Sequence, residues 1–139
     1  MKVVVDTNCL LPSIPRDGKG KWLYDAFYEG RFTWVISNEI LSEYTEIISN
    51  EFSPKAADLV VALLVTSPNH SRYEPFFRWG LITEDPDDNK FVDCAIGANV
   101  DYLVTDDKHI LNLLKRDNLF PPVPVVSLAQ FKRILAKLR

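Results

Sequence analysis

Four acidic side chains stand at positions from which they could act on one ligand. Asp6 directly follows the valines of VVVDTN, and Asp107 comes soon after YLVT. Glu43 and Asp88 stand in SNEILSEYTEII and DPDDNKF, whose spacing is typical of helices. Two like charges about 4 Å apart repel by about 4 kcal/mol at an effective dielectric constant near 20. Acids gathered at one place therefore need a cation.

Carboxylate oxygens alone favour a hard divalent cation. Mg²⁺ and Mn²⁺ prefer oxygen ligands, and Mg²⁺ keeps room in its shell for water and substrate phosphate. A metal-bound water beside a phosphodiester can attack phosphorus, while the same ion stabilises the charge that develops on the phosphoryl oxygens. The acids thus indicate metal-dependent phosphodiester hydrolysis.

An α/β fold is predicted because short apolar runs alternate with helical patterns. Strands are expected at 3–5, 32–36, 102–104 and 123–126, with a weaker candidate at 81–83, and helices at 22–29, 38–51, 55–65, 89–99, 110–115 and 128–138. Strands separated by helices imply a central, mostly parallel sheet of four to five strands in a three-layer sandwich. In such sheets the ligand crevice lies beyond the carboxyl ends of the strands, where Asp6 and Asp107 stand.

Helical spacing predicts which glutamate of 38–51 faces inward. Glu43 lies beside the apolar stripe of this helix, whereas Glu39 and Glu46 point further toward solvent. The alternative is that Glu43 is a boundary residue whose stem packs while its carboxylate stays in water.

The second helical acid is predicted from the same kind of pattern. Asp85 before Pro86 is typical of an N-cap, which makes Asp88 an early helical residue on the extension of the buried stripe. Asp88 should face the upper edge of the sheet, and Asp93 should lie on the far, solvated face. The alternative for Asp88 is a purely capping role at the positive end of the helix dipole.

Composition bounds the remaining possibilities. The 139 residues, 47% of them apolar, suit one domain spanning 1–139, and the net charge of −3 argues against a broad basic surface for nucleic acid. No segment has the apolar length of a signal peptide or a membrane span, so we expect a cytoplasmic protein without a membrane partner. Cys9 and Cys94 match no zinc spacing and are expected to be small buried side chains.

The motifs DTNCLL, SNEILSEY, DPDDNKF and DYLVTDDKHIL, in this order, resemble those of the PIN-domain family, in the branch close to the toxin ribonucleases of bacterial and archaeal toxin–antitoxin pairs. The resemblance implies a Rossmann-like sheet, four acids that bind one or two Mg²⁺ or Mn²⁺ ions, and hydrolysis of single-stranded RNA. It also implies a cognate antitoxin protein as partner.

The resemblance assigns roles residue by residue. It makes four acids the metal ligands and catalytic residues, and two polar residues their supports: Asp6, Glu43, Asp88 and Asp107, with Asn8 and Thr105. Asp106 stands where relatives often have glycine, which leaves the choice between Asp106 and Asp107 open.

Three further segments have weaker interpretations. The all-round apolar stretch 59–65 favours a deeply buried helix or a homodimer contact. The aromatic segment 70–80 is expected in the core or at a partner interface rather than stacked on RNA. His109 is expected to be a surface helix residue.

Two other functions compete with a metal-dependent ribonuclease. One is a PIN-like module that binds RNA or protein without cutting, against which the complete set of acids counts. The other is a phosphotransfer or phosphatase domain with Asp6 as phosphate acceptor, which fits less well because Asn8 stands where a second aspartate would be expected.

Overall fold

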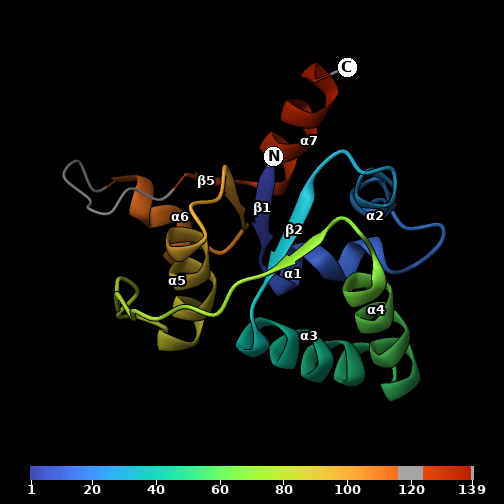
Figure 1. Ribbon diagram of the computed structural model, residues 1–139, viewed down its shortest axis with the longest axis horizontal. Helices are drawn as coiled ribbons and strands as arrows, with labels where there is room; N and C mark the ends of the chain where they lie inside the picture. Colours follow the sequence, from blue (N-terminus) through green and yellow to red (C-terminus); the bar gives the residue numbers. More distant parts are fainter. Residues whose placement is uncertain (116–123, 139) are drawn as a thin grey trace.

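A five-stranded, wholly parallel sheet forms the centre of the molecule, as the computed structural model shows for residues 1–115 and 124–138 (Figure 1). Its strands, in the spatial order β3-β2-β1-β4-β5, are β1 (Lys2–Val5), β2 (Thr33–Ile36), β3 (His70–Arg72), β4 (Tyr102–Val104) and β5 (Val125–Val126). Val3, Val4 and Val5 are all fully buried. Because successive strand side chains point to opposite faces, both faces of the central strand are covered, and the predicted α/β fold is confirmed.

Helices connect the strands throughout. The helices are α1 (Thr7–Leu10), α2 (Lys21–Tyr28), α3 (Asn38–Glu51), α4 (Pro54–Thr66), α5 (Asn89–Gly97), α6 (Lys108–Leu111) and α7 (Leu128–Lys137), with short 3₁₀ turns η1 (Leu11–Ser13), η2 (Pro86–Asp88) and η3 (Asn112–Lys115). Serine side chains fix the starts of three of them by accepting a backbone N–H: Ser37 for α3, Ser53 for α4 and Ser127 for α7. None of the described helices has the length and apolar composition needed to span a membrane.

Tyr44 ties α3 to the central strand beside the candidate site. This fully buried side chain donates a hydrogen bond to the carbonyl oxygen of Val5, and its hydroxyl accepts one from Trp34 Nε1 at 3.2 Å. Val5 is the last residue of β1 and directly precedes Asp6. The contact therefore holds the neighbour of Glu43 against the end of the strand that carries Asp6.

The third strand is not the predicted one. The structure has β3 at His70–Arg72, a short and largely polar edge strand without the apolar run that predicts one. The candidate at 81–83 is not a strand, because the amide side chain of Asn89 pairs with both backbone groups of Ile82, at 2.9 Å each. These bonds take the place of a sheet ladder. Of the strand predicted at 123–126, Val123 lies outside the described residues.

Helix α4 is not deeply buried, contrary to one of the two interpretations of 59–65. Only Ala57 and Leu64 are fully buried, whereas Leu59 and Leu63 are 58% and 49% exposed. The reason is that α4 packs mainly against α3 and leaves its other side open to solvent. The alternative, a homodimer contact through this helix, stays a prediction.

Replacing Tyr44 tests its anchoring role. Tyr44→Phe keeps the ring but removes both hydrogen bonds, so the free energy of unfolding should fall by about 1–3 kcal/mol in urea titrations. The matched control is Tyr28→Phe, whose parent side chain is 75% exposed and should change stability by less than about 0.5 kcal/mol. Equal effects of the two substitutions would contradict this role.

Candidate metal centre

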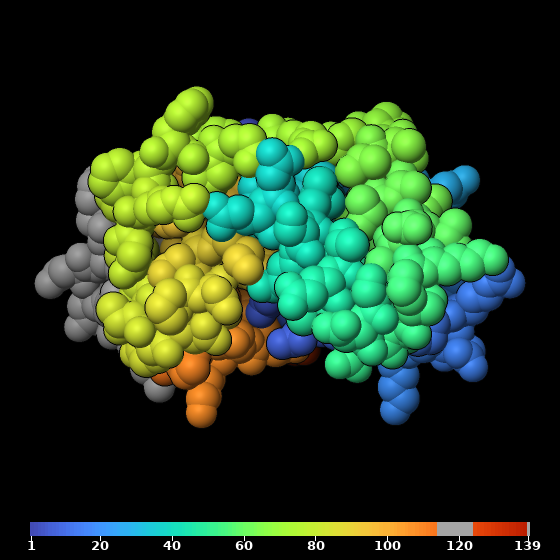
Figure 2. Space-filling view, turned by 90° about the horizontal axis from the view of Figure 1, so that it is seen from below, coloured from blue at the N-terminus to red at the C-terminus, as the bar shows by residue number. Residues whose placement is uncertain are grey.

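The carboxyl ends of β1 and β4 bring Asp6 and Asp107 to the same edge of the sheet. These strands are neighbours, with Val5 opposite Val104, and each is followed closely by its acid. Viewed from below, blue atoms from the beginning of the chain emerge between the teal of α3 and the yellow and orange of α5 and α6 (Figure 2). The beginning of the chain thus reaches the surface between α3, which carries Glu43, and the starts of α5 and α6, where Asp88 and Asp107 stand.

Asp6 is the most buried acid of the group. Its side chain is only 4% exposed, and Thr105 Oγ1 donates a hydrogen bond to its Oδ2 at 2.8 Å. Burial raises the pKa of Asp6 from 3.8 to about 6, with smaller contributions from the negative charges of Glu43 and Asp107, and the Thr105 hydrogen bond opposes the rise. Asp6 therefore shares one electrostatic environment with two other predicted acids.

Glu43 faces inward from α3, as its helical spacing predicts. Its side chain is 20% exposed, against 50% for Glu39. Thr7 Oγ1 donates a hydrogen bond to one carboxylate oxygen, and Lys90 Nζ lies 2.8 Å from the other. Neither partner is predicted from the sequence, although Thr7 directly follows Asp6 and Lys90 stands two positions after Asp88.

Asp88 and Asp107 complete the acidic group. The Asp88 side chain is 13% exposed, and its pKa is raised to about 7, first by burial and then by the charges of Asp107, Asp85 and Asp6. Asp107 Oδ1 accepts the backbone N–H of His109 at 2.7 Å, and its own N–H donates to Thr105 Oγ1 at 3.0 Å. The charges of Glu43 and Asp107 thus act on Asp6, and those of Asp107 and Asp6 act on Asp88, so the four predicted acids are electrostatic neighbours.

The two supporting residues differ in their placement. Thr105 is fully buried and links Asp6 to the Asp107 backbone, as described above. Asn8 is exposed, and within the described part of the chain its side chain forms no hydrogen bond. Its expected contact with a carboxylate or a metal-bound water stays a prediction.

Asp106 points away from the acidic group. It is exposed, and its Oδ1 accepts the backbone N–H of Leu128 at the start of α7, at 3.1 Å. Of the two neighbours Asp106 and Asp107, only Asp107 contributes to the raised pKa values of Asp6 and Asp88. The geometry favours Asp107 as the acid of this pair that faces the site.

Asp93 is buried, so its expected place on a solvated face was wrong. Its side chain is 3% exposed and accepts the backbone N–H of Trp79 at 3.0 Å. Segment 73–83 lies over this side of α5, which helical spacing alone does not reveal. Cys94 and Cys9 are buried as expected.

The aromatic segment is also more exposed than a core segment would be. Phe76 and Phe77 are 95% and 60% exposed, so the core interpretation is wrong for these two side chains. They lie on a stretch without helix or strand, where no helix covers them. The partner interface stays a prediction.

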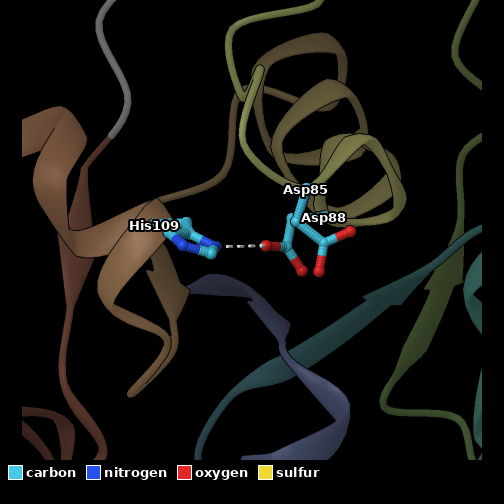
Figure 3. Close-up of side chains that lie close together, drawn as sticks. All are labelled: Asp85, Asp88 and His109. Atoms are coloured by element: carbon cyan, nitrogen blue, oxygen red, sulfur yellow. Dashed lines mark ion pairs between the residues drawn. The ribbon is translucent and has the colours of Figure 1, made fainter.

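A divalent cation fits the residues around Asp88. The side chains of Asp85, Asp88 and His109 offer ligand atoms that all lie within 4.8 Å of one another (Figure 3). Asp88 Oδ2 and His109 Nδ1 are buried and have no hydrogen-bond partner among the described residues. Buried polar atoms without partners are rare and costly, and a cation would satisfy both the carboxylate oxygen and the ring nitrogen.

The raised pKa of Asp6 predicts a pH-dependent stability in metal-free buffer. The folded protein holds this proton more tightly than the unfolded chain does, so stability is lost as pH rises from the unfolded value of 3.8 through about 6. Asp6→Asn lacks this titration. Denaturant unfolding should therefore show that, from pH 4.5 to pH 8, the free energy of unfolding of Asp6→Asn rises by about 2 kcal/mol relative to that of the parent.

Asp87→Asn is the matched control, because Asp87 is exposed and stands next to Asp88. Its stability difference from the parent should be flat over the same pH range. If the stability difference between Asp6→Asn and the parent did not change with pH, the pKa of Asp6 would not be raised in the folded protein.

Comparisons with known proteins agree with this fold. A sequence profile of the PIN domain matches residues 2–109. Among solved structures, the chain is similar to the crystal structure of VapBC2 from Rickettsia felis bound to a DNA fragment from their promoter. The TM-score is 0.62 and the identity 17%, with 91% of this chain and 98% of the other covered. No curated protein sequence matches the chain. With the profile matching most of its length, the chain belongs to the PIN-domain family.

Proposed function

We propose that the protein is a metal-dependent endoribonuclease that hydrolyses phosphodiester bonds of single-stranded RNA. The observation that carries this proposal is the mutual influence of Asp6, Glu43, Asp88 and Asp107 at the carboxyl edge of the sheet. Carboxylates whose charges act on one another in this way suit one or two Mg²⁺ or Mn²⁺ ions. We assign these four residues as ligands and catalytic residues, within a single domain.

The residues of the site would bind the metal ion and orient the RNA phosphate beside it. A bound ion would supply a water of lowered pKa and positive charge for the phosphoryl oxygens. Thr105 and Thr7 hold the Asp6 and Glu43 carboxylates in place through their hydroxyls. Lys90 neutralises part of the Glu43 charge and lies at the edge of the site, where it can attract an RNA phosphate.

We further propose that the ribonuclease is the toxin of a toxin–antitoxin pair in the cytoplasm. The order of its motifs and the likeness to VapBC2 support a protein antitoxin as partner. The exposed Leu59 and Leu63 on α4 support a homodimer contact, because large exposed apolar side chains on one helix are typical of interfaces.

Cleavage of RNA is the direct test. Single-stranded RNA incubated with Mn²⁺ should be cut by the parent and spared when a chelator is added. Asp6→Asn should abolish cleavage, and Asp88→Asn should lower its rate by about an order of magnitude or more, since each loses a charged ligand. Asp87→Asn removes an exposed charge from the same turn and should cut normally.

Each variant must be compared at a temperature where it is folded, because loss of an acid at a helix start costs about 0.5–1 kcal/mol in any role. RNA binding without cleavage by the parent would favour the non-cleaving PIN-like module instead. Equal activity of the parent and Asp6→Asn would point to a contaminating ribonuclease.

Metal binding can be measured separately from activity. Mg²⁺ or Mn²⁺ should raise the melting temperature of the parent, since a ligand present at 100 times its Kd adds about 2.7 kcal/mol of stability. A double mutant, Asp6→Asn with Asp107→Asn, should show hardly any shift. Equal shifts in both proteins would place the ion elsewhere.

A further inference from the structure

His109 has no role in the proposed hydrolysis, although it lies among the site's acids. It stands in α6, and its side chain is 30% exposed. Its Nδ1 lies 3.8 Å from Asp88 Oδ2 and 3.8 Å from Asp107 Oδ1. In Figure 3 the ring faces Asp88, with Asp85 behind it, across the space between α6 and the start of α5.

These separations do not describe a hydrogen bond. At 3.8 Å a ring N–H is too far from either carboxylate to donate to it. Two atoms that each lie about 2.1 Å from one ion can, by contrast, be up to about 4.2 Å apart. The Nδ1 and Oδ2 atoms are therefore spaced as two ligands of the same cation would be.

The environment of these atoms supports the same conclusion. Both are buried, and neither has a hydrogen-bond partner among the described residues. The backbone N–H of His109 is bonded to Asp107 Oδ1, which fixes the start of α6 and directs the ring toward Asp88. A ring nitrogen without a hydrogen-bond partner can serve as a metal ligand.

We propose that His109 ligates the metal through Nδ1, beside Asp88 and Asp85. The inference rests on the proposed function for the presence of the ion, and it adds the His109 nitrogen and the Asp85 carboxylate to the four acids. Both ions prefer oxygen ligands, but Mn²⁺, as a transition-metal ion, accepts an imidazole nitrogen more readily than Mg²⁺ does. The site should therefore bind Mn²⁺ more tightly than Mg²⁺, with His109 as the source of the preference.

Pulsed electron paramagnetic resonance of bound Mn²⁺ detects a ligating nitrogen directly. The chain has only two histidines, so His70 on β3 is the matched control. In protein without a histidine tag, the parent and His70→Gln should show nitrogen modulation of the Mn²⁺ echo. His109→Gln should lose it.

Calorimetric titration gives a second readout. His109→Gln should raise the Kd for Mn²⁺ by about tenfold or more, as loss of a group at a metal site commonly does. The Kd for Mg²⁺ should change by less than about threefold. If His109→Gln does not fold, labelling the one remaining histidine of His70→Gln with ¹⁵N answers the question, because modulation from His109 must change with the isotope.

The outcomes separate the two proposals. If Mn²⁺ binding depends on Asp6 but its echo shows no modulation from a histidine nitrogen, the role of His109 is overturned and the proposed function still stands. A parent that binds no Mn²⁺ overturns both. Nitrogen modulation that persists in His109→Gln and disappears in His70→Gln also overturns the role of His109.

Discussion

Burial of carboxylates close to one another at one edge of the sheet is the constraint on which the rest of the site depends. The parallel pairing of β1 with β4 places Asp6 beside the turn that carries Asp107, whatever the helices do. The molecule buries Asp6 instead of leaving it in water, so the cost appears as a raised pKa. Thr105 reduces this cost by donating to Asp6 and accepting from the backbone of Asp107, which places a single hydroxyl between the two acids.

The helices add acids to this edge and also bring groups that stabilise the charged carboxylates. Tyr44 holds α3 against the end of β1, so its neighbour Glu43 reaches the edge, where Thr7 and Lys90 meet the carboxylate. At the start of α5 the balance differs: Asp88 faces other acids and a histidine too distant for a hydrogen bond. The Glu43 side is neutralised within the protein, whereas the Asp88 side keeps unpaired atoms. The demand for a cation is thus concentrated around Asp88 and His109.

The sequence reveals the acids because each lies on an element with a strong pattern. Valines before Asp6, YLV before Asp107 and the apolar stripes of α3 and α5 determine which way the carboxylates face. It does not reveal Asp93 as buried or His109 as part of the site, since these depend on where irregular segments run. Segment 73–83 covers Asp93 through the backbone of Trp79, and the turn after Asp107 directs His109. Strand β3 escapes prediction for a related reason: a three-residue polar edge strand gains its pairing from β2, not from its own residues.

Protons and a metal ion would relieve the same repulsion, so they compete for the site. With pKa values raised to about 6 and about 7, Asp6 and Asp88 lose their protons in the range from mildly acidic to neutral pH when no ion is bound. Binding of a divalent ion would have to displace those protons, so its apparent affinity rises with pH across this range. The burial that destabilises the charged, metal-free site also strengthens its attraction for a cation, because both effects arise from the low dielectric around the carboxylates. Stability lost by gathering the acids is therefore recovered only in the state that binds the ion.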